Sequence, residues 1–103
     1  MGYYTNFNLR HDNDAIEAET LATELSEISG YRWEDDLALS SVKWYDWQKD
    51  MKKLSASHMG TLFTLKGEGE DSGDQWVAYV KSGKMQVVNA VITFAPFDES
   101  KLK

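Results

Sequence analysis

The chain of 103 residues contains no cysteine, one proline and two histidines, and it has no long apolar run. Without cysteine, the protein has no disulfide, no thiol nucleophile and no thiolate ligand for zinc or an iron–sulfur cluster. The longest mainly apolar stretch, near Val87–Phe97, is too short to cross a membrane. The N-terminal residues show no signal-peptide pattern. These absences predict a cytoplasmic protein that neither spans nor binds a membrane.

Length and composition are those of one globular domain. A chain of this mass buries about 65% of its unfolded surface on folding, which is enough for one core and too little for two. Hydrophobic residues make up 42% and aromatic residues 13% of the chain, which argues against intrinsic disorder. We therefore expect a single domain over residues 1–103, with a loose tail at about 98–103.

Negative charge is concentrated in one third of the chain. The net charge is −6, and residues 12–36 hold nine acids but only one base, Arg32. Residues 37–66 are instead basic, with five lysines and two aspartates. Non-specific binding to nucleic acid needs many cations to neutralise phosphates, so direct nucleic-acid binding is not expected. The acidic third favours a partner with a basic surface, or else it forms a solvated face that keeps the protein soluble.

Two periodic segments begin the chain. Apolar and polar side chains alternate over Tyr3–Arg10, which predicts a half-buried strand. Helical spacing of apolar residues follows at about Asp14–Ser29, and Gly30 stands where a left-handed C-terminal cap is expected.

The remainder divides at turn-forming residues. Tyr31–Ser40 is interpreted as a loop, Ser41–Tyr45 as a short strand, and a second helix is expected between Asp46 and Gly60. The remaining strands are predicted at Thr61–Lys66, Trp76–Lys81 and Met85–Phe94, with a hairpin turn at Ser82-Gly83 and Phe97 docked on the domain.

This order, β-α-(β)-α-β-β-β, predicts an α+β fold. We expect a two-layer sandwich in which two helices cover one face of a mainly antiparallel sheet of four to five strands. The other face of that sheet would carry Tyr4, Asn6, Asn8 and Arg10.

A glycine-rich acidic segment, Gly67–Asp74, is interpreted as a loop. Its carboxylates would repel a phosphate group, which excludes a nucleotide-binding loop. Glu68, Glu70, Asp71 and Asp74 offer oxygen ligands for Ca²⁺ or Mg²⁺, but the calcium-loop pattern is missing. A flexible acidic connection is the simpler interpretation, and neither a metal nor a cofactor is predicted.

Three aromatic residues lie within four positions, at Trp44, Tyr45 and Trp47. They cannot all point inward from one strand or one helix, so at least one is expected at a surface. Exposed Trp and Tyr are typical anchors of protein interfaces. The alternative is that both tryptophans lie in the core and Tyr45 packs at its edge.

Catalytic motifs are missing from the sequence. His11 and His58 are far apart in the chain, and Ser55 and Ser57 form no known nucleophile motif with His58. We therefore predict that the protein is not an enzyme.

A set of short motifs carries a resemblance over about residues 41–103. The motifs are Lys43-Trp44-Tyr45-Asp46, Asp50-Met51, Leu62-Phe63-Thr64-Leu65, Gly67-Glu68-Gly69-Glu70, Gly73-Asp74, Trp76, Tyr79, Gly83-Lys84 and Gln86. In these positions the chain resembles small, mostly uncharacterised proteins of phages and bacterial mobile elements. The resemblance implies an accessory protein that inhibits a host enzyme or defence system. It implies no catalytic residues.

The leading hypothesis is a non-catalytic interaction module that binds and inhibits a host protein with a basic surface. One version is a DNA mimic, in which carboxylates take the place of phosphates. The candidate interaction residues are Glu24, Glu27, Trp33, Asp35, Asp36, Trp44, Tyr45, Trp47, Glu68, Glu70, Asp71 and Asp74.

Two other functions stay open. The first is a protein that binds a small molecule or nucleotide through Arg10, Trp44, Tyr45, Lys84 and Gln86. The second is a small metal-dependent hydrolase. A homodimer through the open sheet face or an edge strand is compatible with any of the three.

Overall fold

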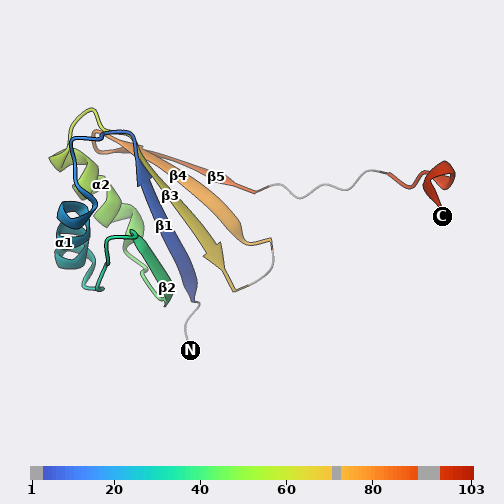
Figure 1. The fold of residues 1–103 in the computed structure, drawn as a ribbon, viewed down its shortest axis with the longest axis horizontal. Coiled ribbons are helices and arrows are strands. Elements are labelled where there is room, and N and C mark those ends of the chain that lie inside the picture. Colours follow the sequence, from blue (N-terminus) through green and yellow to red (C-terminus); the bar gives the residue numbers. More distant parts are fainter. Residues whose placement is uncertain (1–3, 71–72, 91–95) are drawn as a thin grey trace.

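A computed structural model describes residues 4–70, 73–90 and 96–103 of the chain, and Figure 1 shows how its elements are arranged. The elements are β1 (Thr5–His11), α1 (Ala18–Ser29), β2 (Ala38–Val42), α2 (Trp47–Ser57), β3 (Phe63–Gly69), β4 (Gln75–Lys81), β5 (Lys84–Asn89) and a 3-10 turn, η1 (Glu99–Lys101). The strands form an antiparallel five-stranded sheet in the order β2-β1-β3-β4-β5. This confirms the predicted α+β fold.

Both helices lie on the same side of the sheet, so the molecule has two layers (Figure 1). Helix α2 contacts β4 and β5, and it also contacts α1. The core fills the space between the layers. Its buried apolar side chains are Phe7, Leu9, Leu21, Ala22, Leu25, Trp33, Leu37, Leu39, Trp44, Met51, Leu54, Phe63, Leu65, Ala78 and Val80.

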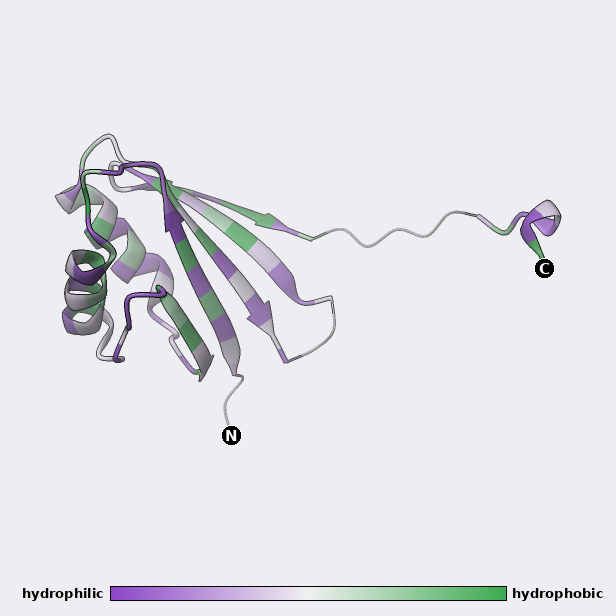
Figure 2. Cartoon of the chain, viewed as in Figure 1, coloured by the Kyte–Doolittle hydropathy of each residue, from purple (hydrophilic) through white to green (hydrophobic). Residues whose placement is uncertain are grey.

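Strand β1 confirms the alternation read from the sequence. Phe7 and Leu9 are buried beneath the helices, whereas Asn6, Asn8 and Arg10 are exposed on the opposite side. Hydrophilic and hydrophobic residues alternate along the strands in Figure 2. The sheet side that faces away from the helices is called the open sheet face below.

The first helix begins at Ala18, four residues later than predicted. Asn13 explains the difference, because its Oδ1 accepts a hydrogen bond from the N–H of Ala15 and its carbonyl accepts one from the N–H of Ile16. Such local bonds compete with a helix and hold a turn instead. The predicted end is confirmed, since Gly30 caps the helix with a φ of 78°.

Strand β2 also differs from its predicted position. It covers Ala38–Val42 and so begins inside the segment interpreted as a loop, three residues before the expected start at Ser41. Ser41 has a φ of 52°, which breaks the regular strand geometry. Trp44 and Tyr45 therefore lie beyond the strand.

Strand β3 continues to Gly69, so the first part of the expected acidic loop is sheet. Gly67 pairs with Phe7 on one side and with Trp76 on the other. Strand pairing on both sides outweighs the low strand propensity of glycine here.

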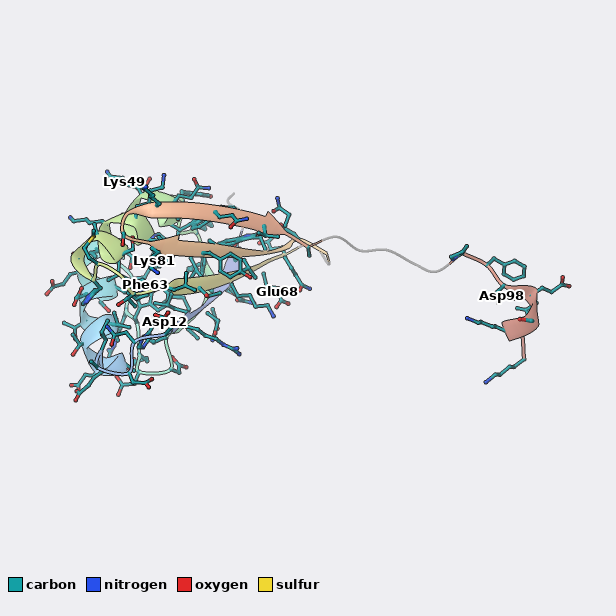
Figure 3. All side chains as sticks on the ribbon, turned by 90° about the horizontal axis from the view of Figure 1, so that it is seen from above. Asp12, Lys49, Phe63, Glu68, Lys81 and Asp98 are labelled. Carbon is teal, nitrogen blue, oxygen red and sulfur yellow. The ribbon has the colours of Figure 1, made fainter. Side chains whose placement is uncertain are left out.

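The C-terminal part agrees with the prediction only up to Asn89, where β5 ends. The expected continuation through Ile92 and Phe94 lies outside the described residues. Phe97 was expected to dock on the domain, but 78% of its surface is exposed. In Figure 3, Asp98 and its neighbours stand apart from the sheet and the helices.

Candidate binding surfaces

The four tryptophans form one aromatic cluster with Phe7. Ring centroids lie 5.5 Å apart for Trp33 and Trp44, 5.1 Å for Trp44 and Phe7, and 5.9 Å for Phe7 and Trp76. Trp76 then stacks on Trp47 at 4.1 Å. Edge-to-face and offset pairs of this kind add stability beyond the area that they bury.

The indole N–H groups of the two most buried tryptophans are also hydrogen-bonded within the protein. Trp33 donates its indole N–H to Ser29 Oγ at 3.1 Å, and Trp44 donates to Asp50 Oδ2 at 2.7 Å. Both side chains are only 4% exposed. Trp33 and Trp44 are therefore core residues that expose little surface to a partner, which differs from their place in the expected interaction set.

Tyr45 and Trp47 behave differently from each other. Tyr45 is 70% exposed, while Trp47 is half-buried against Trp76. The aromatic part of the expected interaction surface is thus reduced to Tyr45 and one edge of Trp47.

Acidic side chains gather on α1 and on the segment that follows it. Glu19, Glu27, Glu34 and Asp35 line a shallow hollow of about 400 Å³, with Trp33 also in its wall. Asp36 adjoins them and accepts the N–H of Ala38 at 3.2 Å. These five acids are called the acidic surface below, and they are Glu19, Glu27, Glu34, Asp35 and Asp36. Of the expected residues, Glu27, Asp35 and Asp36 belong to it.

Glu24 has another role, although it is also on α1. Both of its carboxylate oxygens lie close to His58 Nε2, at 2.9 and 3.0 Å. The contact is partly buried and joins α1 to the end of α2. Glu24 is therefore engaged in holding the helix layer together.

Three of the remaining expected acids, Glu68, Glu70 and Asp74, are in or next to the ends of β3 and β4 that lie away from α1 (Figure 1). Glu68 is exposed on the open sheet face, and Glu70 accepts the N–H of Tyr4 at 2.9 Å. Asp74 accepts the N–H of Gly69 at its carbonyl, and Asp71 lies outside the described residues. Within the described part of the chain, no group of three His, Asp or Glu side chains is placed to hold a metal ion.

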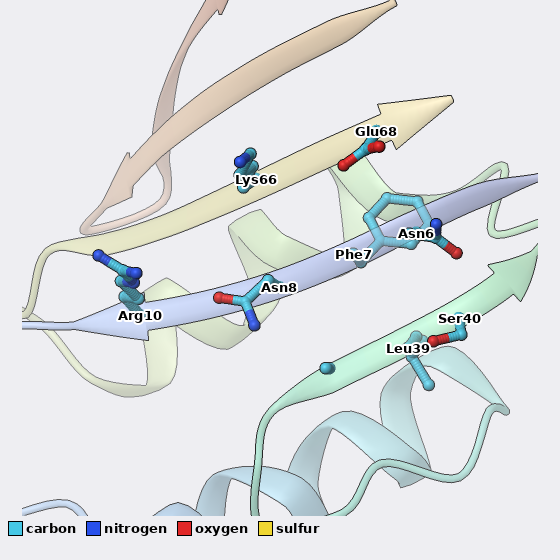
Figure 4. A pocket seen from close by; sticks show the side chains of 9 residues that line it. Asn6, Phe7, Asn8, Arg10, Leu39, Ser40, Lys66 and Glu68 are labelled. Carbon is cyan, nitrogen blue, oxygen red and sulfur yellow. The ribbon is translucent and has the colours of Figure 1, made fainter. Parts of the chain in front are cut away.

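The open sheet face carries a second candidate surface. Strand register places Arg10, Thr64, Tyr79 and Gln86 in one row across β1, β3, β4 and β5. A shallow hollow of about 400 Å³ lies beside β1, where Asn8, Arg10 and Lys66 project from the strands (Figure 4). Its remaining polar lining residues are Asn6, Ser40 and Glu68.

This hollow borders an irregular stretch of the β1–β2 ladder. Thr5 pairs with Val42 and Phe7 with Leu39, so β2 has one residue more than β1 between these pairs. Ser41 donates its N–H to Asn6 Oδ1 at 2.7 Å, which replaces a bond that the ladder lacks there. The bulge is thereby held in one conformation.

The β4–β5 turn is attached to the helix layer. Ser82 and Gly83 both have positive φ, as a two-residue type I′ hairpin turn requires. Gly83 donates its N–H to Ser55 Oγ at 2.9 Å, and Gly60 donates to Ser82 Oγ at 3.1 Å. Lys81 and Lys84 are opposite each other at the strand ends next to this turn. Their backbone positions are therefore held by the hydrogen bonds of the turn.

A second hollow, of about 430 Å³, lies beside this turn. Its lining residues are Leu62, Tyr79, Lys81, Ser82, Lys84, Met85 and Gln86. Of the residues expected for a small ligand, Lys84 and Gln86 line this hollow, whereas Arg10 is on the same face but lines the hollow beside β1. Trp44 and Tyr45, which precede α2, line neither of these two hollows.

Lys66 and Tyr79 also belong to the open sheet face, although neither is among the site residues predicted from the sequence. The alternation of Trp76–Lys81 and the Ser82-Gly83 turn together predict which side chains of the hairpin share a face, since a two-residue turn sets the register of the two strands. That register places Tyr79 opposite Gln86 and Lys81 opposite Lys84.

Among the described residues, no helix is long and apolar enough to span a membrane. Comparisons of the chain with models of protein families, with curated proteins and with solved structures found no match.

Proposed function

We propose that the protein is a non-catalytic binding protein whose acidic surface docks on a basic surface of a host-cell protein and inhibits it. The observation that supports this proposal is the exposed, largely uncompensated charge of the acidic surface around its hollow. Arg32 is the one base among its lining residues, and it pairs with Glu34 at 3.2 Å in a contact that is mostly exposed. Exposed pairs of this kind contribute about 0–1 kcal/mol.

The geometry of α1 favours a partner with several positive charges. Glu19 and Glu27 are eight residues apart on the helix, which separates their backbone positions by about 12 Å along the axis. Helix α1 contains no basic residue that could offset them. Because like charges repel one another, a basic partner lowers the electrostatic free energy of this surface. In the DNA-mimic version, the carboxylates occupy the positions of phosphates along a basic groove.

The resemblance to small proteins of phages and mobile elements is the reason for placing the partner in a host cell. Inhibition then follows from occupancy, because a surface covered by this protein is closed to its own ligand. A cytoplasmic location is part of the same proposal.

The test is the triple variant Glu27→Gln, Asp35→Asn, Asp36→Asn. These substitutions remove three charges, and the amide introduced at position 36 keeps an oxygen for the N–H of Ala38. Glu24 is left unchanged because its contact with His58 is structural. The tagged protein is used to capture its partner from nuclease-treated host lysate, and the affinity for the purified partner is then measured at low and high salt.

The matched control is Glu68→Gln, Glu70→Gln, Glu99→Gln, which removes the same charge elsewhere. We expect the first variant to lose at least about tenfold in affinity, equivalent to about 1.4 kcal/mol, and the control to lose little. Equal affinities for the two variants would refute docking through the acidic surface.

A further inference from the structure

Positive charge surrounds one exposed aromatic ring on the open sheet face. Tyr79 is 41% exposed, and Lys81 follows it by two residues on the same side of β4. Lys84 and Lys66 stand diagonally beside Tyr79, on β5 and β3. Diagonal neighbours in a sheet lie about 7–8 Å apart, within reach of long side chains. Lys81 and Lys84 line the same hollow as Tyr79, and Lys66 lies on the other side of the ring along the strands.

The pair Lys81 and Lys84 is unfavourable in the free protein. The two residues are directly opposite each other in the ladder, where like charges destabilise a sheet. The turn between them is attached to Ser55 and Gly60, so the strand ends that carry them are held in place. An anion between the two ammonium groups would offset this repulsion, and a turn already held by hydrogen bonds loses little conformational freedom on binding.

Hydrogen-bonding groups complete the surroundings of the ring. Thr64 and Gln86 flank Tyr79 on the two neighbouring strands, and together they offer both donors and acceptors. Tyr79, Lys81, Lys84 and Gln86 line one shallow, open hollow of about 430 Å³, a volume within the range of small-molecule sites.

We propose that this end of the open sheet face binds a nucleoside phosphate. The base lies on the ring of Tyr79 with its edge towards Gln86, and the phosphate lies between Lys81 and Lys84. An exposed aromatic ring on a sheet surface is a stacking platform for a base, and lysine ammonium groups are common phosphate ligands.

Charge complementarity selects a small anion over a long polyanion. Glu68 is the acid among the described strand residues of this face, and it stands at the other end of β3 from the turn. At physiological salt, charges beyond about 8 Å are largely screened, so a single phosphate responds mainly to the lysines. A nucleic-acid strand would extend past the lysines, towards Glu68 and the other acids of a chain with net charge −6.

The test is isothermal titration calorimetry of the full chain with the four ribonucleoside monophosphates. Adenosine and inorganic phosphate are measured as separate probes of the two halves of the site. We expect at least one nucleotide to bind about tenfold more tightly than either half alone. If none of the four nucleotides binds, or if phosphate binds as tightly as they do, the proposal is overturned.

Substitutions of Lys84 and Tyr79 test the proposed contacts with the phosphate and the base. Lys84→Gln is expected to weaken nucleotide binding about tenfold, because a charged hydrogen bond is lost. Lys84→Arg keeps the charge and is expected to retain binding. Tyr79→Leu should weaken the nucleotide but leave inorganic phosphate unchanged. Lys49→Gln, on α2, is the matched control for charge. Retention of full affinity by both Lys84→Gln and Tyr79→Leu would overturn the site.

A single-stranded oligonucleotide is the last probe. Affinity for it more than about tenfold above that of the nucleotide would identify a strand of nucleic acid as the occupant and overturn the proposal in its present form. This site lies on the layer opposite the helices, so its result is independent of the proposed docking through the acidic surface.

Discussion

The indole ring of Trp76 lies against the α-carbon of Gly67, its partner across the β3–β4 ladder. A methyl group at position 67 would overlap the ring. With no side chain there, Trp76 lies over β3 and stacks on Trp47 at an interplanar angle of 19°. Trp47 is the first residue of α2, so this contact joins the helix layer to the sheet.

We expect Gly67→Ala to destabilise the protein by about 1–3 kcal/mol, because the added methyl group displaces the Trp76 ring from a well-packed position. Urea unfolding gives the free energy, and near-UV circular dichroism reports the loss of the Trp47–Trp76 stack. Lys66→Ala is the control, since its side chain is on the open sheet face. Equal stability of the two variants would show that Trp76 moves away at no cost.

Neighbouring aromatic residues should differ sharply on truncation. Trp44→Ala removes a 4% exposed side chain whose N–H is bonded to Asp50, and we expect a loss of about 3–5 kcal/mol. Tyr45→Ala removes a 70% exposed side chain, and we expect a change within about 0.5 kcal/mol. Thermal unfolding of both variants checks the difference. A small effect at Trp44 would contradict its place in the core.

The bulge in β2 predicts opposite effects of glycine at two adjacent serines. Ser41 has a φ of 52°, a conformation that costs an L-residue roughly 1–2 kcal/mol and glycine very little. Ser41→Gly should therefore be neutral or stabilising by up to about 1 kcal/mol. Ser40→Gly lacks this relief and should cost roughly 0.5–1 kcal/mol. Chemical unfolding of the two variants side by side measures the sign of each change.

Ser55 should be needed for the rigidity of the β4–β5 turn. Its hydroxyl is fully buried, accepts the N–H of Gly83 and donates to the carbonyl of Lys52. We expect Ser55→Ala to cost about 1–3 kcal/mol, because the Gly83 N–H loses its acceptor. Ser57→Ala, at an exposed position of the same helix, should change stability by less than about 0.5 kcal/mol.

Hydrogen exchange at the amide of Gly83 separates this explanation from a general loss of stability. Exchange at Gly83 should accelerate more in Ser55→Ala than exchange at amides of β1 and β3. Uniform acceleration across the sheet would indicate global opening instead.

Local patterns in the sequence were sufficient for the elements with strong periodicity. Phe7 and Leu9 alternate with polar residues, and Leu21 and Leu25 recur at helical spacing, so their buried sides follow from the backbone geometry of strand and helix. The Ser82-Gly83 turn was also evident, because few residue pairs tolerate positive φ at both positions. The α+β fold follows from the order of these elements.

Other features depended on contacts between distant segments. Gly67 belongs to a strand because β1 and β4 pair with it on both sides, and no neighbour in sequence indicates this. Trp44 is buried because its ring packs against Phe7 of β1, a strand far away in the sequence. A local pattern therefore could not decide which aromatic residue of 44–47 would reach the surface.

For the two candidate surfaces as well, local sequence patterns predict some features and contacts between distant segments decide the others. The sequence by itself determined that residues 12–36 are acidic, and a helix with one apolar stripe exposes most of its polar side. Only the tertiary structure decided that Glu24 is held by His58 and that Lys66 joins the hairpin residues Tyr79, Lys81 and Lys84 on one face. The physical reason is that residue periodicity is local, whereas strand order and register depend on pairing between segments distant in the chain.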